Sequence, residues 1–589
     1  MIQKQTNGTH SSHFLFAFCS QRTTPHQDRH LIKPATHTVS HTTRFKGNNL
    51  SPTKKYAAAS KDKMRQGPGL KEFIAGNSEP ILVDRPHIPY LPESLQTTSK
   101  RKVYFDVYGC QMNLSDTEIV WSILKNEGFE KTDVEEEADI FLVMTCAIRE
   151  GAESKIWYRL DHLRGFKRRR VAKDKQRPVT IGLLGCMAER LKEKLIEKEK
   201  AVDIVAGPDS YRDLPRLLAN GQTAVNVLLS LDETYADVAP VRLNEDSVSA
   251  FISIMRGCDN MCTYCIVPFT RGRERSRPVS SILEEVRQLA GQGVKEITLL
   301  GQNVNSYRDT SQQTEKVDTP TPRFKTVYKS KKGGLRFADL LDKVSLIDPE
   351  MRIRFTAAHP KDFPDEVLQV ISERANICKM LHLPAQSGSS AVLERMRRGY
   401  SRDAYLRLVD HVRTTIPGVG LSTDMICGFC GETDEEFEET MTLLQQVGYN
   451  IAFLFPYSMR EKTTAYRRYK DDVPDHVKKD RHNRMVEVYR RICQQLNDHE
   501  VGTTHLVLVE GVVKKTGQIL GRNEFYLKVV FDNVAIACED GAQRLAVPGD
   551  YVAVKIQGAR SSVLSGFPLY HSSIKDFYRE RCWKDRAGI

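Results

Sequence analysis

Between residues 101 and 222, short apolar runs alternate with stretches that have helical periodicity. Such alternation predicts βαβ units and therefore a parallel sheet with helices packed against it. Three of the apolar runs lead directly into a cysteine: 103–109 into Cys110, 140–145 into Cys146, and 179–185 into Cys186. Ligands bind at the carboxyl ends of the strands in such sheets, so we expect the three thiols to meet at one edge. Three separate buried cysteines are the alternative, because free cysteine is often buried.

A second series of apolar runs, separated by amphipathic helical patterns, fills residues 244–498. The six strands expected there are Phe251–Met255, Glu296–Leu300, Arg352–Thr356, Met380–Leu383, Ser422–Ile426 and Ile451–Phe455. Six βα-like units fit a partial parallel barrel, with reactive residues at the carboxyl ends of its strands. The polar segment Asp309–Gly334 interrupts the series and reads as a surface insertion.

From Gly502 onward the pattern changes to short β runs broken by Gly and Pro. The runs are His505–Glu510, Tyr526–Phe531, Tyr551–Ile556 and Ser562–Leu569. Their spacing predicts a small antiparallel β-barrel over 499–572, followed by a loose tail at 573–589. The fold class is therefore α/β, with an N-terminal parallel domain, a partial (β/α)6 barrel and a C-terminal β-barrel.

Composition narrows the class of protein further. The chain has 589 residues, 40% of them apolar and 28% charged, which suits a globular protein of several domains. No apolar run approaches the roughly 20 residues that span a bilayer. Thirteen cysteines at irregular spacings do not form a disulfide framework, so a reducing compartment is expected. A net charge of +12 favours a polyanionic partner such as nucleic acid.

The first hundred residues lack a sustained apolar pattern. Residues 1–60 contain eight Lys or Arg, one acid (Asp28) and many Ser, Thr and His residues. This composition is typical of an organellar transit peptide and predicts import into mitochondria. A plain disordered tail would look similar. The Pro-rich stretch Pro80–Ser99 reads as a linker, and forms lacking the N-terminal segment are expected in the cytoplasm or nucleus.

A second group of three cysteines lies within one short loop. Cys258, Cys262 and Cys265 are separated by three and then two residues, so their sulfurs can converge on one metal centre. Structural zinc usually takes four ligands, and four cysteines complete an iron–sulfur cluster. Three thiolates therefore predict a cluster with one iron left open. An incomplete zinc knuckle and ordinary buried cysteines are the alternatives.

The loop Arg256–Cys265, with an aromatic residue before its last cysteine, resembles the signature of the radical S-adenosylmethionine (SAM) superfamily. The segments around the other three cysteines resemble the N-terminal domain of methylthiotransferases: Tyr108–Asn113, Thr145–Glu150 and Gly185–Arg190. This resemblance implies two [4Fe-4S] clusters, held by Cys110, Cys146 and Cys186 and by Cys258, Cys262 and Cys265. It also implies that SAM binds at the open iron of the second cluster, with Gln302, Gln386 and Ser387 as contacts; turn or capping roles are the alternative for these three.

The Gln-Met-Asn segment after Cys110 resembles the branch of the family that acts on N6-isopentenyladenosine in the tRNA anticodon loop. The resemblance implies that a flavodoxin- or ferredoxin-like donor reduces the loop cluster and that a radical derived from SAM attacks C2 of the adenine. Sulfur would then come from the other cluster and the methyl group from a second SAM. Alternative substrates are threonylcarbamoyladenosine tRNA and a ribosomal protein. A regulatory protein that binds a cyclin-dependent-kinase regulatory subunit is the alternative from another class.

Three further segments bear on nucleic-acid binding. The basic run Arg164–Arg170 is expected to contact RNA phosphates, with solvated surface as the alternative. Arg271, Arg273, Arg275 and Arg277 alternate, which predicts one arginine face for RNA phosphate or the SAM carboxylate. Val509–Gly511 and Gly521–Asn523 resemble the RNA-binding TRAM module, for which a structural cap is the alternative.

Overall fold

A computed structural model describes residues 101–147, 150–174, 179–219, 223–311, 333–539 and 541–579. The transit peptide and linker expected at 1–100, and most of the insertion expected at Asp309–Gly334, lie outside these residues. The chain divides into two compact units, Met1–Arg85 and Pro86–Ile589, and the description below concerns the second. Within the described residues, no helix is both long and apolar enough to cross a membrane.

The N-terminal domain is built on a six-stranded parallel sheet with the order β2-β1-β3-β4-β5-β6. Its strands are β1 (Lys102–Val107), β2 (Glu130–Lys131), β3 (Ile140–Thr145), β4 (Thr180–Gly185), β5 (Ile204–Ala206) and β6 (Ala224–Asn226). Its helices are α2 (Gln111–Asn126), η3 (Glu135–Glu137), α3 (Glu150–Asp174), α4 (Cys186–Leu191), α5 (Glu193–Lys198), η4 (Tyr211–Asp213) and α6 (Leu214–Ala219). The three predicted strands are thus confirmed as neighbours, and three short strands were not foreseen.

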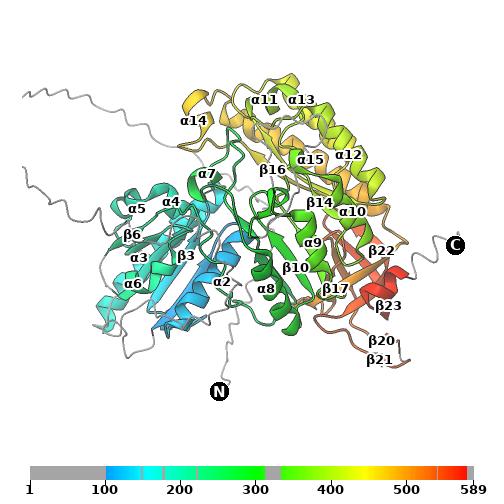
Figure 1. Ribbon diagram of the computed structural model, residues 1–589, viewed down its shortest axis with the longest axis horizontal. Helices are drawn as coiled ribbons and strands as arrows, with labels where there is room; N and C mark the ends of the chain where they lie inside the picture. The colour runs from blue at the N-terminus through cyan, green and yellow to red at the C-terminus, as the bar shows by residue number, and fades with distance from the viewer. Residues whose placement is uncertain are drawn as a thin grey trace, which may run out of the picture. The chain divides into compact units, whose positions relative to one another are not determined.

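Strand β3 is buried on both faces because helices cover the sheet from both sides (Figure 1). Leu142 packs with residues of α2 and α6, whereas Phe141 and Val143 pack with residues of α3 and α4. This alternation explains why the strand reads as a continuous apolar run.

The middle of the chain forms two three-stranded parallel sheets with the orders β13-β10-β7 and β14-β15-β16. The strands are β7 (Ser249–Ser253), β10 (Glu296–Leu300), β13 (Arg352–Phe355), β14 (Met380–His382), β15 (Gly420–Cys427) and β16 (Ile451–Pro456). A parallel bridge between Ile353 and Ile377 joins the two sheets. All six predicted strands are confirmed, in sequential order, as a partial barrel.

Helices follow the barrel strands and bury their apolar sides against them. They are α7 (Val267–Thr270), α8 (Val279–Gly291), η5 (Val304–Ser306), α9 (Phe337–Ser345), η6 (Pro360–Asp362), α10 (Asp365–Glu373), α11 (Ser390–Arg395), α12 (Arg402–Thr415), α13 (Asp434–Val447), α14 (Thr464–Arg468) and α15 (Asp475–Asp498). Two small antiparallel pairs complete the region: β8 (Met255–Arg256) with β9 (Arg275–Ser276), and β11 (Arg308–Asp309) with β12 (Leu335–Arg336). The second pair joins the two ends of the predicted insertion.

The C-terminal domain is a seven-stranded sheet in which β19, β18, β17, β22 and β23 close into a barrel, and β20 and β21 extend from β23. Its strands are β17 (Thr504–Val512), β18 (Ile519–Arg522), β19 (Lys528–Phe531), β20 (Ile536–Ala537), β21 (Gln543–Arg544), β22 (Tyr551–Arg560) and β23 (Val563–His571). The barrel is not purely antiparallel as expected, because β23 closes it through a parallel pairing with β19; β20 also pairs with β23 in parallel.

The predicted tail begins later than expected. Residues 574–579 are helical, and Ile574 and Phe577 are buried against the β-barrel. The carboxylate of Glu350 accepts hydrogen bonds from the backbone N–H groups of Ile574 and Lys575. The segment is therefore held between the β-barrel and the loop before β13, where its apolar side chains leave water.

Candidate functional site

The carboxyl ends of β1, β3 and β4 bring three cysteines to one edge of the N-terminal sheet. Val107 pairs with Met144, and Thr145 pairs with Gly185, so the residues that follow lie side by side. Cys110 precedes α2 and Cys186 begins α4. The geometry therefore gathers Cys110, Cys146 and Cys186 where the strand pattern predicted them.

Two glycines make this gathering possible. Gly109 has φ +108°, and a Cβ atom there would stand 2.5 Å from the Cβ of Cys146. Gly185 has φ +91°, and its Cβ would stand 2.7 Å from the carbonyl oxygen of Thr145. Only glycine combines these backbone angles with such close approach.

A buried arginine of the partial barrel, Arg271, contacts one of the cysteines at this edge of the sheet. The Nε–H of Arg271 donates to the sulfur of Cys186 at 3.2 Å. A hydrogen bond with the Cys146 thiol lowers the pKa of Cys110 to about 6; burial opposes this shift, and the charge of Arg271 supports it. Burial raises the pKa of the Cys186 thiol, with Arg271 acting in the opposite direction. The edge thus favours negative charge on the sulfur of Cys110, and Arg271 partly offsets the effect of burial at Cys186.

The second trio occupies the loop after β8. Cys258 and Cys262 are buried and Cys265 is half-buried. Gly257 has φ +75°, and a Cβ there would collide with the backbone carbonyl of Arg273, two residues before β9. The tight turn presses the loop against the β8–β9 hairpin.

Barrel residues hold the other side of this loop. The backbone N–H of Thr263 donates to the carbonyl of Met396, and its hydroxyl donates to the carbonyl of Arg395. Arg398 donates to the sulfur of Cys262 at 3.5 Å and to the carbonyl of Pro384 at 2.8 Å. The loop is therefore bonded to the barrel at both backbone and sulfur.

Burial raises the pKa of Cys258 well above its usual range and raises that of Cys265 to about 12, and the negative charges of the neighbouring thiolates add to both shifts. The sulfurs of Cys258 and Cys265 therefore lie close enough to neighbouring sulfurs for their charges to interact. Metal binding would require their deprotonation, so it would be coupled to proton release.

The three residues predicted to contact SAM differ in the hydrogen bonds that they already make within the protein. Gln302 follows β10, and its Oε1 atom is buried without a hydrogen-bond partner among the described residues. The Ser387 hydroxyl instead lies 3.1 Å from the Thr440 hydroxyl of α13. Gln386 adopts φ +72° and bonds through its backbone to both Asp424 and Ile426. Gln302 thus has a buried side-chain acceptor that no described residue satisfies.

A polar pair on the inner side of the barrel was not foreseen. His382, at the end of β14, accepts a hydrogen bond at Nδ1 from the backbone N–H of Ala357, and its Nε2 lies 3.5 Å from Asp424 Oδ2. Its ring also meets Phe453 edge-on, with the centroids 6.3 Å apart. Polar residues alternating with apolar ones in these strands were the available signal, because neighbouring positions face opposite sides.

The prediction that the alternating arginines form one RNA- or SAM-facing surface is wrong for three of the four. Arg271 is buried at the cysteine edge, Arg275 makes two hydrogen bonds to Asp209, and Arg277 binds Glu285 at 2.7 Å. Arg273 alone is exposed, by 68%. The segment crosses between two domains, where internal carboxylates pair with its cations.

Several side chains of the basic run on α3 form ion pairs within the N-terminal domain. Lys167 binds Asp203, Arg164 binds Glu199, and Arg170 lies 3.5 Å from Asp139. Arg168 and Arg169 are exposed. These two side chains remain the ones that can reach an external phosphate.

The donor set fits iron–sulfur clusters better than a single ion. No group of three or more His, Cys, Asp or Glu side chains in the described part of the chain is arranged to hold one metal ion. A cluster is larger than an ion, and its thiolate ligands stand further apart. Each trio consists of thiols alone, which are the usual ligands of such clusters.

The two cysteine sites adjoin each other. Cys186 and Ala147 pack against Ile266, the residue that follows Cys265, and Phe269 of α7 completes the contact. Two thiol trios thus lie on either side of one small apolar seam.

Residues 252–444 match the radical SAM superfamily, and residues 102–207 match a family described as uncharacterized protein family UPF0004. The mitochondrial tRNA methylthiotransferase CDK5RAP1 of Mus musculus is 55% identical, and the match covers 89% of this chain and 92% of that protein. This protein belongs to the radical SAM tRNA methylthiotransferase family. A bacterial relative from Chloroherpeton thalassium, tRNA-2-methylthio-N(6)-dimethylallyladenosine synthase, is 48% identical over 81% of this chain and 98% of its own.

Family membership makes the protein a radical SAM enzyme, with a [4Fe-4S] cluster and SAM as its cofactors. Cys258, Cys262 and Cys265 lie within the matched radical SAM region, whereas Cys110, Cys146 and Cys186 lie within the other matched region.

Proposed function

We propose that this protein adds a 2-methylthio group to N6-isopentenyladenosine in the anticodon loop of mitochondrial tRNAs. The observation that carries the proposal is the pair of adjoining thiol trios, at Cys110, Cys146 and Cys186 and at Cys258, Cys262 and Cys265. Radical formation and sulfur insertion need separate metal centres close to one substrate, and the two trios meet this need. The names of the relatives support the same substrate.

The two trios would have different chemical roles, one in radical formation and the other in sulfur delivery. A [4Fe-4S] cluster with SAM supplies a radical able to remove an unreactive hydrogen, which no side chain can do. Cys258, Cys262 and Cys265 would hold that cluster, with Gln302, Gln386 and Ser387 nearby for SAM. Cys110, Cys146 and Cys186 would hold the second cluster, from which sulfur is delivered.

Hydrogen bonds from neighbouring residues hold the loop of Cys258, Cys262 and Cys265 in position. Arg398 orients Cys262, and Thr263 ties the loop to the segment after α11. Because Cys258 and Cys262 are buried, water has limited access to the loop trio, which would limit side reactions of a radical.

An anaerobic preparation tests the central claim. With two clusters, reconstituted protein should bind about eight irons per chain. It should also form 5′-deoxyadenosine from SAM and convert isopentenylated tRNA to the methylthiolated product. Binding at only one trio, or zinc in place of iron, would remove the basis of the sulfur-insertion reaction.

Mass spectrometry of tRNA from cells lacking the protein separates the substrates. Loss of the 2-methylthio group from isopentenyladenosine is expected. Loss from threonylcarbamoyladenosine, or from a ribosomal protein, would point to the alternative substrates.

A reducing partner and a regulatory partner complete the proposal. A flavodoxin- or ferredoxin-like protein would deliver the electron, and a cyclin-dependent-kinase regulatory subunit is a candidate binding partner. If a Cys258→Ala protein kept every cellular effect, the regulatory function would replace the enzymatic one.

For tRNA binding, Arg168 and Arg169 of α3 and the C-terminal TRAM-like barrel are the proposed contacts. Replacing both arginines with Gln should lower the salt dependence of binding by about one unit of slope per lost phosphate contact. An unchanged slope would remove α3 from the interface.

The N-terminal segment is proposed to direct import into mitochondria. Deleting residues 1–60 should shift the protein to the cytoplasm or nucleus, as seen by fractionation. Retention in mitochondria would contradict this role.

A further inference from the structure

A buried carboxylate links the two cysteine sites through two arginines. Asp116, on α2, is fully buried. Its Oδ1 lies 2.8 Å from Nη2 of Arg256, and its Oδ2 accepts a hydrogen bond of 2.8 Å from Nη2 of Arg271. Removing one partner from such a buried group leaves uncompensated charge, so the three residues act as one unit.

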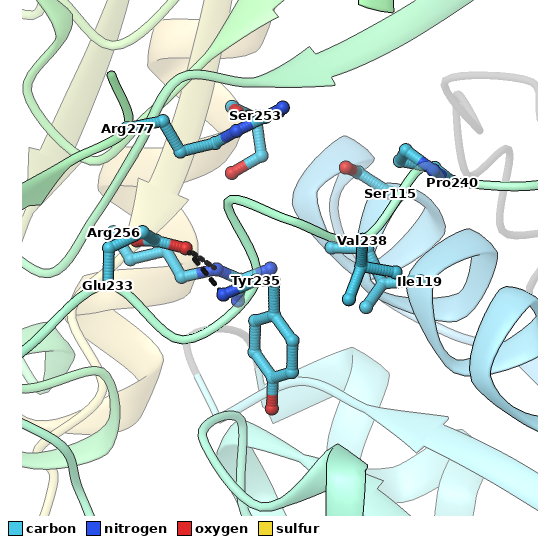
Figure 2. A pocket seen from close by; sticks show the side chains of 9 residues that line it. All are labelled: Ser115, Ile119, Glu233, Tyr235, Val238, Pro240, Ser253, Arg256 and Arg277. Carbon is cyan, nitrogen blue, oxygen red and sulfur yellow. Dashed lines mark hydrogen bonds and ion pairs between the residues drawn. The ribbon is translucent and has the colours of Figure 1, made fainter. Parts of the chain in front are cut away.

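Arg256 ties this unit to the loop trio. It stands two residues before Cys258, and its guanidinium lies 4.8 Å from the centroid of the Tyr235 ring. Figure 2 shows it beside Glu233, whose carboxylate lies 3.8 Å from its Nε. The start of the cysteine loop is thereby anchored to the N-terminal domain.

Arg271 ties the same unit to the sheet-edge trio. Its Nε–H donates to Cys186, and its Nη2 also reaches the Asn113 side chain at 3.3 Å. Its Nη1 is buried and has no hydrogen-bond partner among the described residues. A buried, unpaired cationic N–H is costly unless a negatively charged group accepts from it.

A thiolate-bound cluster supplies such a group. Hydrogen bonds to cluster sulfurs and nearby positive charge stabilise the reduced state and raise the reduction potential. Arg271 has both properties at the sheet-edge site. Its planar fork, held by Asp116 on one edge, cannot be reproduced by lysine.

We propose that Arg271 is a positioning residue that holds Cys186 at the sheet-edge site and raises the reduction potential of the cluster there. Asp116 fixes the orientation of Arg271 and connects it through Arg256 to the loop trio. This inference rests on the proposed function, namely that Cys110, Cys146 and Cys186 bind a cluster.

The test isolates the sheet-edge cluster in the full-length chain. Cys258, Cys262 and Cys265 are all replaced by Ala, and this parent is reconstituted with iron and sulfide. Arg271→Gln and Arg271→Lys are introduced into the parent. Arg273→Gln is the matched control, because Arg273 lies in the same segment but is 68% exposed. Iron content, melting temperature without iron, and midpoint potential by electron paramagnetic resonance are measured.

The Arg271→Gln chain should bind as much iron as the parent but with a more negative potential. The midpoint potential is expected to fall by about 59 mV for one electron, which corresponds to about a tenfold change in the ratio of reduced to oxidised cluster. Arg271→Lys should give a smaller shift in the same direction, and Arg273→Gln none. An unchanged potential in both Arg271 variants would overturn the proposal.

Loss of iron is also informative. If both Arg271 variants lose iron while their melting temperatures match the parent, Cys186 has lost the donor that holds it, which supports the proposal. If they lose iron and their melting temperatures collapse, Arg271 only joins the domains and the proposal fails. If the parent itself binds no iron, the proposed function fails first.

Discussion

The two cysteine trios are built in opposite ways. Cys258, Cys262 and Cys265 come from one loop, and their approach depends on a local turn at Gly257. Cys110, Cys146 and Cys186 come from three strands, and their approach depends on the register of the whole sheet. One site is therefore local and the other is tertiary, yet both contain buried thiols that meet at one seam.

This difference predicts how each site fails. A local site is lost when its own loop is altered, whereas a tertiary site is lost when strands or domains shift. Residues that join the domains should therefore affect the sheet-edge site before the loop site.

Replacing one cysteine in each trio should separate the two chemical steps. Cys258→Ala should abolish 5′-deoxyadenosine formation and tRNA product, because the cofactor carries that step. Cys110→Ala should keep 5′-deoxyadenosine formation but yield no methylthiolated tRNA. Each variant should lose about half of its iron if two [4Fe-4S] clusters are present.

The control for these variants is Cys430→Ala. Cys430 is buried among Phe429 and Tyr457 and belongs to neither trio. It should retain full iron content and both activities. Equal loss of 5′-deoxyadenosine formation in the Cys110 and Cys258 variants would show that the trios are not separate.

Asp116→Asn should cost about 3–5 kcal/mol in the free energy of unfolding, because it leaves two buried arginines without their shared carboxylate. Urea denaturation of the iron-free protein measures this loss. Asp434→Asn is the comparison, since Asp434 pairs with Arg481 but is 85% exposed. A loss no larger than that of Asp434→Asn would contradict the linking role of Asp116.

Alanine at the turn glycines should destabilise each site separately. Gly185→Ala combines an unfavourable φ with a 2.7 Å contact and should cost about 1–3 kcal/mol, with loss of iron at the sheet edge. Gly257→Ala should remove iron from the loop trio instead. Gly418→Ala, which has φ +74° and open space around its Cβ, should cost about 1 kcal/mol without loss of iron. The same iron loss in all three variants would reject the separation.

The buried carboxyl of Glu118, on α2 and close to Glu285 of α8, should make the free energy of unfolding depend on pH. Burial raises its pKa to about 8, with Glu285 adding to the shift while Arg242 and the Leu243 N–H oppose it. Because the folded state favours the protonated acid, stability is fully present below the unfolded pKa of 4.5 and is lost as pH rises toward 8. Glu118→Gln should therefore gain stability relative to the unchanged protein between pH 5 and pH 8.5.

Thermal unfolding at several pH values measures this gain. Glu284→Gln is the control, since Glu284 has a side chain 60% exposed on the neighbouring helix α8. If the difference in melting temperature between Glu118→Gln and the unchanged protein stays constant across this pH range, the raised pKa of Glu118 is contradicted.

The strand pattern located most of the fold before any coordinates were known. Runs ending at Cys110, Cys146 and Cys186 identified the central strands because buried parallel strands are nearly all apolar. Short strands such as β5 and β6 were missed, since three residues carry too little periodicity. In the C-terminal domain, the short strands β18, β20 and β21 were missed for the same reason.

The arginines show the limit of pattern. Alternation places Arg271 to Arg277 on a common surface, but Arg271 and Arg275 pair with carboxylates 155 and 66 residues away in the sequence. Arg277 instead pairs with Glu285 of the following helix α8. The hydroxyl of Ser387, a residue that the resemblance implies as a SAM contact, lies 3.1 Å from that of Thr440 on α13, 53 residues away. Partners separated by tens of residues cannot be identified from local composition.

Both sets of thiols can be identified from the amino-acid sequence, because cysteine spacing within a loop and cysteine position after a strand are local properties. That the two sets adjoin, that Arg271 reaches Cys186 and that Asp116 joins them depend on how the domains pack together. Chain spacing limits which residues can meet, whereas the packing of separate domains selects which of them do.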